Sequence, residues 1–345
     1  MKRWGWAVAA LFLAAGVTAQ TLDQPVATIK LDKKSSLVSQ KAFRDQLATL
    51  ESSQGVKLGP DDKAKLLDEM IIQELIRMDI EAQGIKANDE DLLKQFRTSN
   101  PGLTDAQIRA EVEKQSGKPW DDAVVGLKRQ VATMKYFNQF PQAADVGKVT
   151  VTDQEVQAFY DANNARYAAP DYIRVSHIFF DTKVKPKGTL AEIQQRAADT
   201  LKKITSGQAT FEEMAASVSD DPTSAKVNGD IGFLPRSLDG PLGQQLQKVF
   251  GQDFLNAAFA LKKGEVSGVM TSNSGLHIIR VTQKIDKRFL GLEDPVFPGQ
   301  PETVRMAIQR QLQQKKLSEN QAKMVQEIGA NLRAKATVKI FEQNF

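Results

Sequence analysis

Two short runs of the sequence have the pattern of β-strands: Val175-Ser176-His177-Ile178-Phe179 and Ser274-Gly275-Leu276-His277-Ile278-Ile279. Each has apolar residues at every second position, and side chains two apart on a strand share one face. The sequence contains only two histidines, and each run carries one of them. We therefore predict that both imidazoles point into the same small domain.

A pair of inward histidines also has an ordinary interpretation, as core residues satisfied by a neighbouring hydroxyl or backbone group. The sequence around them argues for more than packing. Ser176 and Ser274 flank the pair, and Asp221 lies in a segment from Ser219 to Phe233 that is rich in turn-forming residues. Such a composition is typical of a loop at the edge of a cleft.

These features resemble the parvulin-type peptidyl-prolyl isomerases over about a third of the chain. The resemblance implies a compact α+β domain over residues 171–284, with a small sheet and flanking helices. It also implies isomerisation of X–Pro bonds without metal or cofactor. The shared motifs, in chain order, are His177-Ile178, Gly207 to Ala215, Ser219 to Gly232, Phe254 to Ser267 and Gly275 to Val281.

The same resemblance implies a set of site residues. Its polar members are His177, Asp221, Ser272, Ser274 and His277. The substrate proline would lie against Phe254 and an apolar residue from Leu246 or Phe250. Asp220 is the alternative to Asp221, because an alignment in this loop can slip by one residue. A carboxylate close to the imidazoles would fix their tautomers and raise their pKa.

Isomerisation of an X–Pro bond requires few chemical groups beyond these residues. A peptide bond has a rotation barrier of about 18–20 kcal/mol, which falls when the amide loses its resonance in an apolar slot. Two departures from the family pattern bear on that slot. Asn228 replaces a first glycine, and the segment from Ser237 to Asp253 is longer than in compact members. The longer segment is expected to reshape or cover the slot and to weaken catalysis.

The composition narrows the alternatives. The 345 residues suffice for two or three domains. With 46 basic and 42 acidic side chains, no charge block indicates nucleic acid as a partner. The absence of cysteine excludes disulfides and thiolate metal sites. Two histidines far apart in sequence also argue against a histidine-rich metal site.

The N-terminus has the pattern of a signal peptide. Met1-Lys2-Arg3 is followed by an apolar run from Trp4 to Val17, which is short for a membrane span, and Ala19 closes a small-residue cleavage site. We expect residues 1–19 to be removed, leaving no stable membrane span. The protein would then lie in the periplasm or another extracytoplasmic space. The alternative is an uncleaved anchor.

The flanking regions surround the isomerase-like block. Residues 20–170 read as one strand, Pro25–Leu31, followed by helices. Residues 285–345 read as a long helix, Glu302–Ala334, and a last strand, Ala336–Phe341, that could pair with the first. This order resembles the SurA-type and PrsA-type extracytoplasmic chaperone-isomerases, in which the isomerase domain is inserted into a mainly α-helical chaperone domain.

Two functions follow from that resemblance. The first is a peptidyl-prolyl isomerase and chaperone for unfolded or newly exported polypeptides with X–Pro bonds. The second is a holding chaperone whose parvulin-like domain binds peptide with little or no isomerase activity. Acceleration of X–Pro relaxation in a short peptide would separate the two. The sequence does not indicate the clients, the residue preferred before proline, or the oligomeric state.

Overall fold

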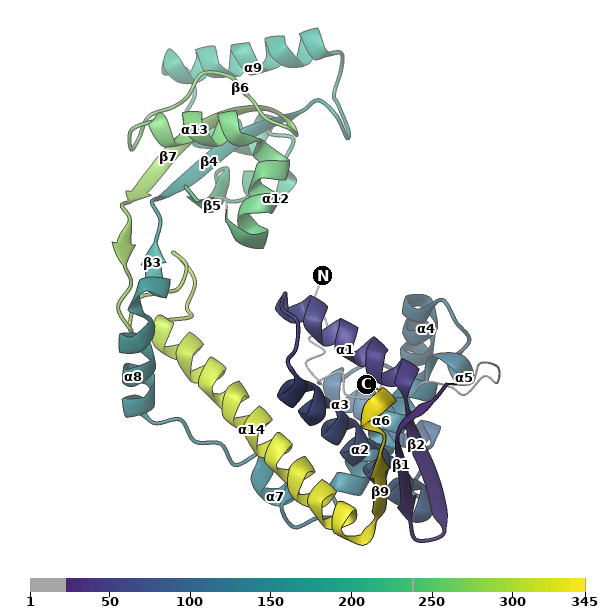
Figure 1. The fold of residues 1–345 in the computed structure, drawn as a ribbon. Helices are drawn as coiled ribbons and strands as arrows, with labels where there is room; N and C mark the ends of the chain where they lie inside the picture. The colour runs from purple at the N-terminus through teal and green to yellow at the C-terminus, as the bar shows by residue number, and fades with distance from the viewer. Residues whose placement is uncertain (1–22, 238, 345) are drawn as a thin grey trace. The chain divides into compact units, whose positions relative to one another are not determined.

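The computed structural model describes residues 23–237 and 239–344, so the expected signal peptide, residues 1–19, lies outside the described residues. The chain separates into two compact units (Figure 1). Of the described residues, the terminal unit comprises 23–150 and 314–344, and the central unit comprises 151–237 and 239–313. In the described ranges, no helix combines the length and the apolar character needed to cross a bilayer.

The terminal unit contains helices around a three-stranded antiparallel sheet of order β2-β1-β9. Its first and last strands pair, with Ala27 opposite Ile340. The hairpin strand β2 was not predicted, because its polar residues give no clear alternation. The elements are β1 (Pro25–Leu31), β2 (Lys34–Ser39), α1 (Gln40–Gln54), α2 (Pro60–Ala82), α3 (Asp89–Ser99), α4 (Asp105–Ser116), α5 (Trp120–Ala123), α6 (Val125–Phe137), α7 (Ala143–Val146), the C-terminal part of α14 (Val304–Lys335), β9 (Thr337–Ile340) and η2 (Glu342–Asn344).

The central unit is built on a four-stranded antiparallel sheet of order β5-β4-β7-β6, and the predicted α+β class is confirmed. The edge strand of this sheet has only two residues, and Val266 adds an isolated bridge to Arg280. The elements are α8 (Asp153–Asn163), η1 (Asn164–Tyr167), β3 (Ala168–Ala169), β4 (Tyr172–Asp181), α9 (Leu190–Thr205), α10 (Phe211–Val218), α11 (Pro222–Ala225), β5 (Asp230–Pro235), α12 (Gly240–Phe250), α13 (Gln252–Ala260), β6 (Met270–Thr271), β7 (Gly275–Ile285), β8 (Arg288–Phe289) and the start of α14.

Each face of this sheet carries its own apolar core. On one face, Val175 and Ile279 pack with residues of α12 and α13, including Phe254. On the other, Ile178 and Ile278 pack with α9 and α10. Alternation along β4 therefore sends odd-numbered side chains, His177 among them, toward α12 and α13.

A third cluster extends the central unit beyond residues 171–284. Val156 of α8 packs with Leu290, and with Val304 and Ile308 at the start of α14. The two-stranded ribbon of β3 and β8 connects this cluster to the larger sheet, with Ala168 opposite Phe289. The compact unit thus includes α8 and the first turns of α14 as well as the four-stranded sheet.

Candidate active site

The two histidines meet on adjacent antiparallel strands. In the pairing of β4 with β7, His177 lies opposite Ile279 and His277 lies opposite Phe179. The residues are 6% and 1% exposed, and their Nδ1 atoms are 3.3 Å apart. The prediction that both imidazoles point into one domain is therefore confirmed by the structure.

Asp221 reaches this pair from the loop that begins α11. Its Oδ2 lies 3.0 Å from His177 Nε2, and its Oδ1 accepts the backbone N–H of Thr223 at 3.0 Å. Ser224, three residues further on, donates its hydroxyl to Asp221 Oδ2 at 2.7 Å and lies 3.0 Å from His177 Nε2. Sequence reasoning missed Ser224; the spacing of three residues after a helix N-cap was the available signal.

Asp220 has a different place. Its Oδ2 accepts the backbone N–H of Asp181 at 3.0 Å and pairs with Arg196, and its Oδ1 lies 2.8 Å from Lys187 Nζ. Its own backbone N–H donates to Phe179 O at 2.7 Å. Asp220 thus fastens the loop to β4, while Asp221 is the carboxylate that contacts an imidazole.

The two serines before β7 also differ. Ser272 Oγ lies 2.8 Å from His277 Nε2 and accepts the backbone N–H of Ser274 at 3.0 Å. Ser274 Oγ instead donates to Val249 O, near the C-terminus of α12, at 2.9 Å. Ser272 therefore belongs to the histidine network. The Ser274 side chain joins the turn before β7 to α12 and makes no hydrogen bond to either imidazole.

One arrangement of protons satisfies all these contacts. Ser272 donates to His277 Nε2, and His277 Nδ1–H donates to His177 Nδ1. His177 Nε2–H then donates to the ionised Asp221. Both imidazoles are neutral in this chain, and all four ring nitrogens have partners. This chain of hydrogen bonds fixes the orientation of Ser272 and Asp221, the polar groups at its two ends.

Burial controls the protonation of this network. It lowers the pKa of His177 against the opposing effect of Asp221, and it lowers the pKa of His277 to about 3. Burial would raise the pKa of Asp221, but hydrogen bonds from Ser224, His177 and the Thr223 backbone together lower it. The expectation of raised histidine pKa values is therefore wrong, because desolvation outweighs the carboxylate.

Aromatic rings form the wall beside the imidazoles. The Phe254 ring centroid lies 5.0 Å from that of His277, and Phe250 stacks on Phe254 at 4.9 Å. Leu246, one turn earlier on α12, is a partly buried neighbour of this cluster. Phe179, whose ring lies 4.9 Å from His277, is a further wall residue to which the sequence assigned no role.

This wall is closed in the structure. Phe254 is 2% exposed and Phe250 8% exposed, so neither ring offers an open face to a proline. Phe250 is the last residue of α12, which occupies most of the long segment between Ser237 and Asp253. The extra segment therefore covers the aromatic position, one of the two effects expected of it.

The backbone of the Gly-rich loop holds His177 in place. Gly229 O accepts the His177 backbone N–H at 2.8 Å. Gly229 has φ +80°, and a Cβ there would lie 2.5 Å from His177 O. Asn228, with φ 59°, adopts the left-handed conformation expected for the position where the family has a glycine.

A small antiparallel sheet with paired neutral histidines, a carboxylate and an aromatic wall defines a domain of the parvulin class. Residues 177–283 match the family model described as rotamase, PPIC-type PPIASE domain. This segment of the chain belongs to that family. The five motifs quoted from the sequence, from His177-Ile178 to Gly275–Val281, all lie within these residues.

Two relatives, a foldase and a chaperone, match more of the chain than the family model does. It is 24% identical over 280 residues to the foldase protein PrsA of Oceanobacillus iheyensis, covering 79% of each protein. It is 30% identical over 298 residues to the chaperone SurA of Alkalilimnicola ehrlichii, covering 83% of this chain and 62% of SurA. The solved peptidyl-prolyl isomerase ESS1 from Candida albicans is 32% identical, with a TM-score of 0.27, over 38% of this chain and 77% of the other.

Proposed function

We propose that this protein is an extracytoplasmic peptidyl-prolyl isomerase and chaperone that assists the folding of exported polypeptides. The observation that carries the proposal is the continuous hydrogen-bonded chain from Asp221 through His177 and His277 to Ser272, beside the ring of Phe254. Neutral, oriented polar groups next to an aromatic wall suit a reaction that breaks no covalent bond.

Asp221 has a physical role in such a reaction. Amide resonance places partial negative charge on the carbonyl oxygen and gives the C–N bond its double-bond character. A carboxylate near that oxygen opposes the charge and favours the twisted amide, which is the transition state. The low pKa of Asp221 keeps this carboxylate ionised, and the imidazole chain fixes its direction.

Substrate entry requires movement of α12. A proline ring can contact Phe254 only when Phe250 withdraws from it, since the two rings are stacked. The carbonyls of Gln247, Lys248 and Val249 are held by the side chains of Asn273 and Ser274. Opening of the slot must loosen these hydrogen bonds, and we expect this step to limit turnover.

The test is isomerisation of a short X–Pro peptide by the full chain, by Phe254→Leu and by Phe259→Leu. Phe259 is a buried phenylalanine of the same helix and the same core, with no ring contact to a histidine among the described residues. Loss of contact at the slot should lower kcat/KM by at least about tenfold in Phe254→Leu alone. Equal effects of both substitutions would make Phe254 a simple core residue.

The closed aromatic wall favours a second candidate, a holding chaperone with little or no isomerase activity. In that case the full chain would suppress aggregation of an unfolded protein and leave X–Pro relaxation at its uncatalysed rate. The two measurements on one preparation separate the candidates. Suppressed aggregation without accelerated X–Pro relaxation would support the holding chaperone.

The place of action rests on the N-terminal sequence, and the names of the relatives, foldase and chaperone, support the choice of partners. We propose removal of residues 1–19 and release into the periplasm or another extracytoplasmic space. Mass spectrometry of the protein purified after export should give an N-terminus at Gln20. An intact Met1 in the exported protein would indicate the uncleaved anchor instead.

A further inference from the structure

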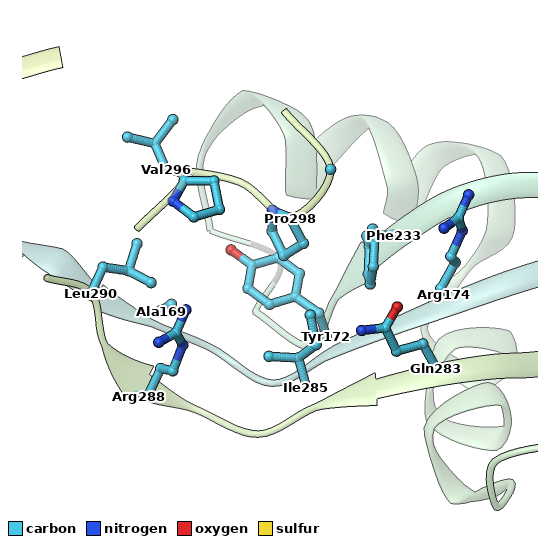
Figure 2. Close-up of a pocket in the computed structure, with 12 residues that line it drawn as sticks. Ala169, Tyr172, Arg174, Phe233, Gln283, Ile285, Arg288, Leu290, Val296 and Pro298 are labelled. Carbon is cyan, nitrogen blue, oxygen red and sulfur yellow. The ribbon is translucent and has the colours of Figure 1, made fainter. Parts of the chain in front are cut away.

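The central unit has a recess on the sheet face opposite the two histidines. A pocket of about 330 Å³ lies at the end of β4, β5 and β7 that is nearest to the β3–β8 ribbon, and Figure 2 shows its lining. Tyr172 and Arg174 of β4 contribute to it. Both are even-numbered residues, so alternation places them on the opposite sheet face from His177. The pocket is therefore distinct from the candidate active site.

A turn from the connection to α14 forms one wall. The sequence Phe297-Pro298-Gly299-Gln300 makes a β-turn, in which Gly299 has φ +82° and the Gln300 N–H donates to Phe297 O at 3.1 Å. The Phe297 ring meets Tyr172 edge to face, with 5.3 Å between centroids. This contact fixes the turn and sets Pro298 across from Phe233.

Tyr172 brings into this pocket a hydroxyl without a protein partner in the described ranges. The residue is only 7% exposed, and its ring crosses the middle of the pocket with the hydroxyl oxygen toward Val296 and Pro298 (Figure 2). Among the described residues its hydroxyl has no hydrogen-bond partner, and burial raises its pKa, which keeps the proton in place. Tyr172 Oη is not among the buried, unpartnered polar atoms of the described residues, so it opens into the pocket, where a ligand can reach it.

The other polar groups of the lining are mainly donors. Gln283 presents its side-chain amide, and Arg174 and Arg288 lie at the rim, where they pair with Asp230 and Asp294. No carboxylate is itself among the lining residues that the structure describes. The apolar surface combines the aromatic rings of Tyr172 and Phe233 with two prolines and four aliphatic side chains, Ala169, Ile285, Leu290 and Val296.

This combination fits one kind of ligand. A polyproline II segment has no internal hydrogen bonds, so its carbonyls seek donors, while its prolines lack the N–H that would require acceptors. Grooves lined by aromatic rings are a recurring means of binding such segments. The carbonyls inside a folded helix are already paired and would offer the Tyr172 hydroxyl no acceptor.

We propose that this pocket binds a proline-rich, extended segment of polypeptide, with the Tyr172 hydroxyl donating to one of its carbonyls. The site would hold a client at a second point, away from the bond being isomerised. Binding here does not depend on catalysis at the histidines. The proposal rests on the function proposed above only for the source of the segment.

The experiment uses the full chain and a fluorescein-labelled peptide of Ala-Pro repeats. Fluorescence anisotropy should show affinity about threefold to tenfold weaker for Tyr172→Phe, the loss expected for one neutral hydrogen bond. Tyr167→Phe is the matched control, because it removes a tyrosine hydroxyl from the same unit outside the pocket, and its affinity should equal that of the original chain. Unchanged affinity in Tyr172→Phe would overturn the proposal.

The absence of cysteine allows the site to be located as well. A benzophenone attached through Gln283→Cys should crosslink to the Ala-Pro peptide, and one attached through Gln195→Cys on α9 should not. Ala-Gly repeats should crosslink at neither position. Equal crosslinking at both positions, or of both peptides, would contradict a proline-selective pocket. Crosslinking at Gln283→Cys without isomerase activity would sustain the pocket and remove the proposed catalysis.

Discussion

His177 Nδ1 and His277 Nδ1 lie 3.3 Å apart, although the two residues are 100 positions apart in the chain. Two protonated nitrogens cannot face each other at this distance, so one of them must be an acceptor. Because Asp221 accepts from the far side of His177, the acceptor is His177 Nδ1. The direction of the whole network follows from that single contact.

Both imidazoles should remain neutral under mildly acidic conditions. The pKa of each is lowered by burial, that of His277 to about 3, against an ordinary value of about 6.5. Since the chain has only two histidines, an NMR titration contains two Cε1–H ring signals, and His177→Gln assigns them. Neither should show the shift of protonation at pH 6. A midpoint above 6.5 for either would contradict the proton arrangement.

The same burial makes stability depend on pH. Above pH 6.5, His277 is neutral in both the folded and the unfolded chain, and it adds no pH dependence. Below that value His277 binds a proton in the unfolded chain but stays neutral in the folded chain, so the free energy of unfolding falls as pH decreases. For His277 the loss should be about 2 kcal/mol at pH 5. Calorimetry of the full chain should show the transition of the central unit decline over this range, and a constant transition temperature would refute the prediction.

Substitution of the two adjacent aspartates should separate catalysis from stability. Asp221→Asn removes the charge that faces His177 and should lower kcat/KM about tenfold or more, the effect of a charge-assisted hydrogen bond of about 1.5–3 kcal/mol. Asp220→Asn breaks the pairs with Arg196 and Lys187 and should lower the free energy of unfolding by about 1–3 kcal/mol.

The readouts are X–Pro isomerisation at a temperature where both variants are folded, and calorimetric unfolding. Each aspartate serves as the control for the other, because the change in side chain is identical. If Asp220→Asn reduces kcat/KM of the folded protein as much as Asp221→Asn does, the assignment of the site carboxylate to Asp221 is wrong.

Gly229, just before β5, and Gly232, within β5, give a test of the backbone around His177. Gly229 and Gly232 have nearly the same φ, +80° and +82°, but only Gly229 approaches other atoms: a Cβ there would lie 2.5 Å from His177 O. Gly232→Ala should cost only the backbone strain of about 1–2 kcal/mol. Gly229→Ala adds a collision with β4 and should cost clearly more, with a loss of isomerase activity. Chemical unfolding measures both, and equal costs would show that the contact with His177 O is not important.

Much of the isomerase-type domain could be predicted from the sequence, because its signals are local. Alternation located β4 and β7, and Thr210 stands three residues before Glu213, the spacing of the capping box that begins α10. The left-handed backbone at Asn228 was also predictable, since asparagine and glycine share that tolerance.

What sequence reasoning missed depends on distant contacts. The hydroxyls of Ser272 and Ser274 look equivalent, but only the fold shows that one meets His277 and the other Val249 O. The sign of the histidine pKa shift depends on the balance of burial against one carboxylate, which no local pattern reveals. The Tyr172 pocket is formed by segments more than a hundred residues apart, joined by Phe297.

The terminal unit should fold and hold unfolded clients without the central unit. Its core joins Phe43 and Ile71 from the N-terminal segment to Ile328 and Leu332 of α14, and β9 completes the sheet beside β1. Both parts are needed, so the variant to test joins residues 23–150 to 314–345 through a flexible linker in place of 151–313. Circular dichroism should show cooperative unfolding of a helical protein.

This shortened chain should also reduce the light scattering of an aggregating client. Exposed apolar side chains such as Val56, Val125 and Met134 give it weak contacts with unfolded chains, each contributing about 25 cal/mol per Å² of apolar area buried. Weak contacts at many points permit release without an energy source. The full chain is the positive control, and a folded protein of similar size that binds no clients is the negative control. If the shortened chain unfolds cooperatively but leaves scattering unchanged, the terminal unit is a scaffold, and client binding belongs to the central unit.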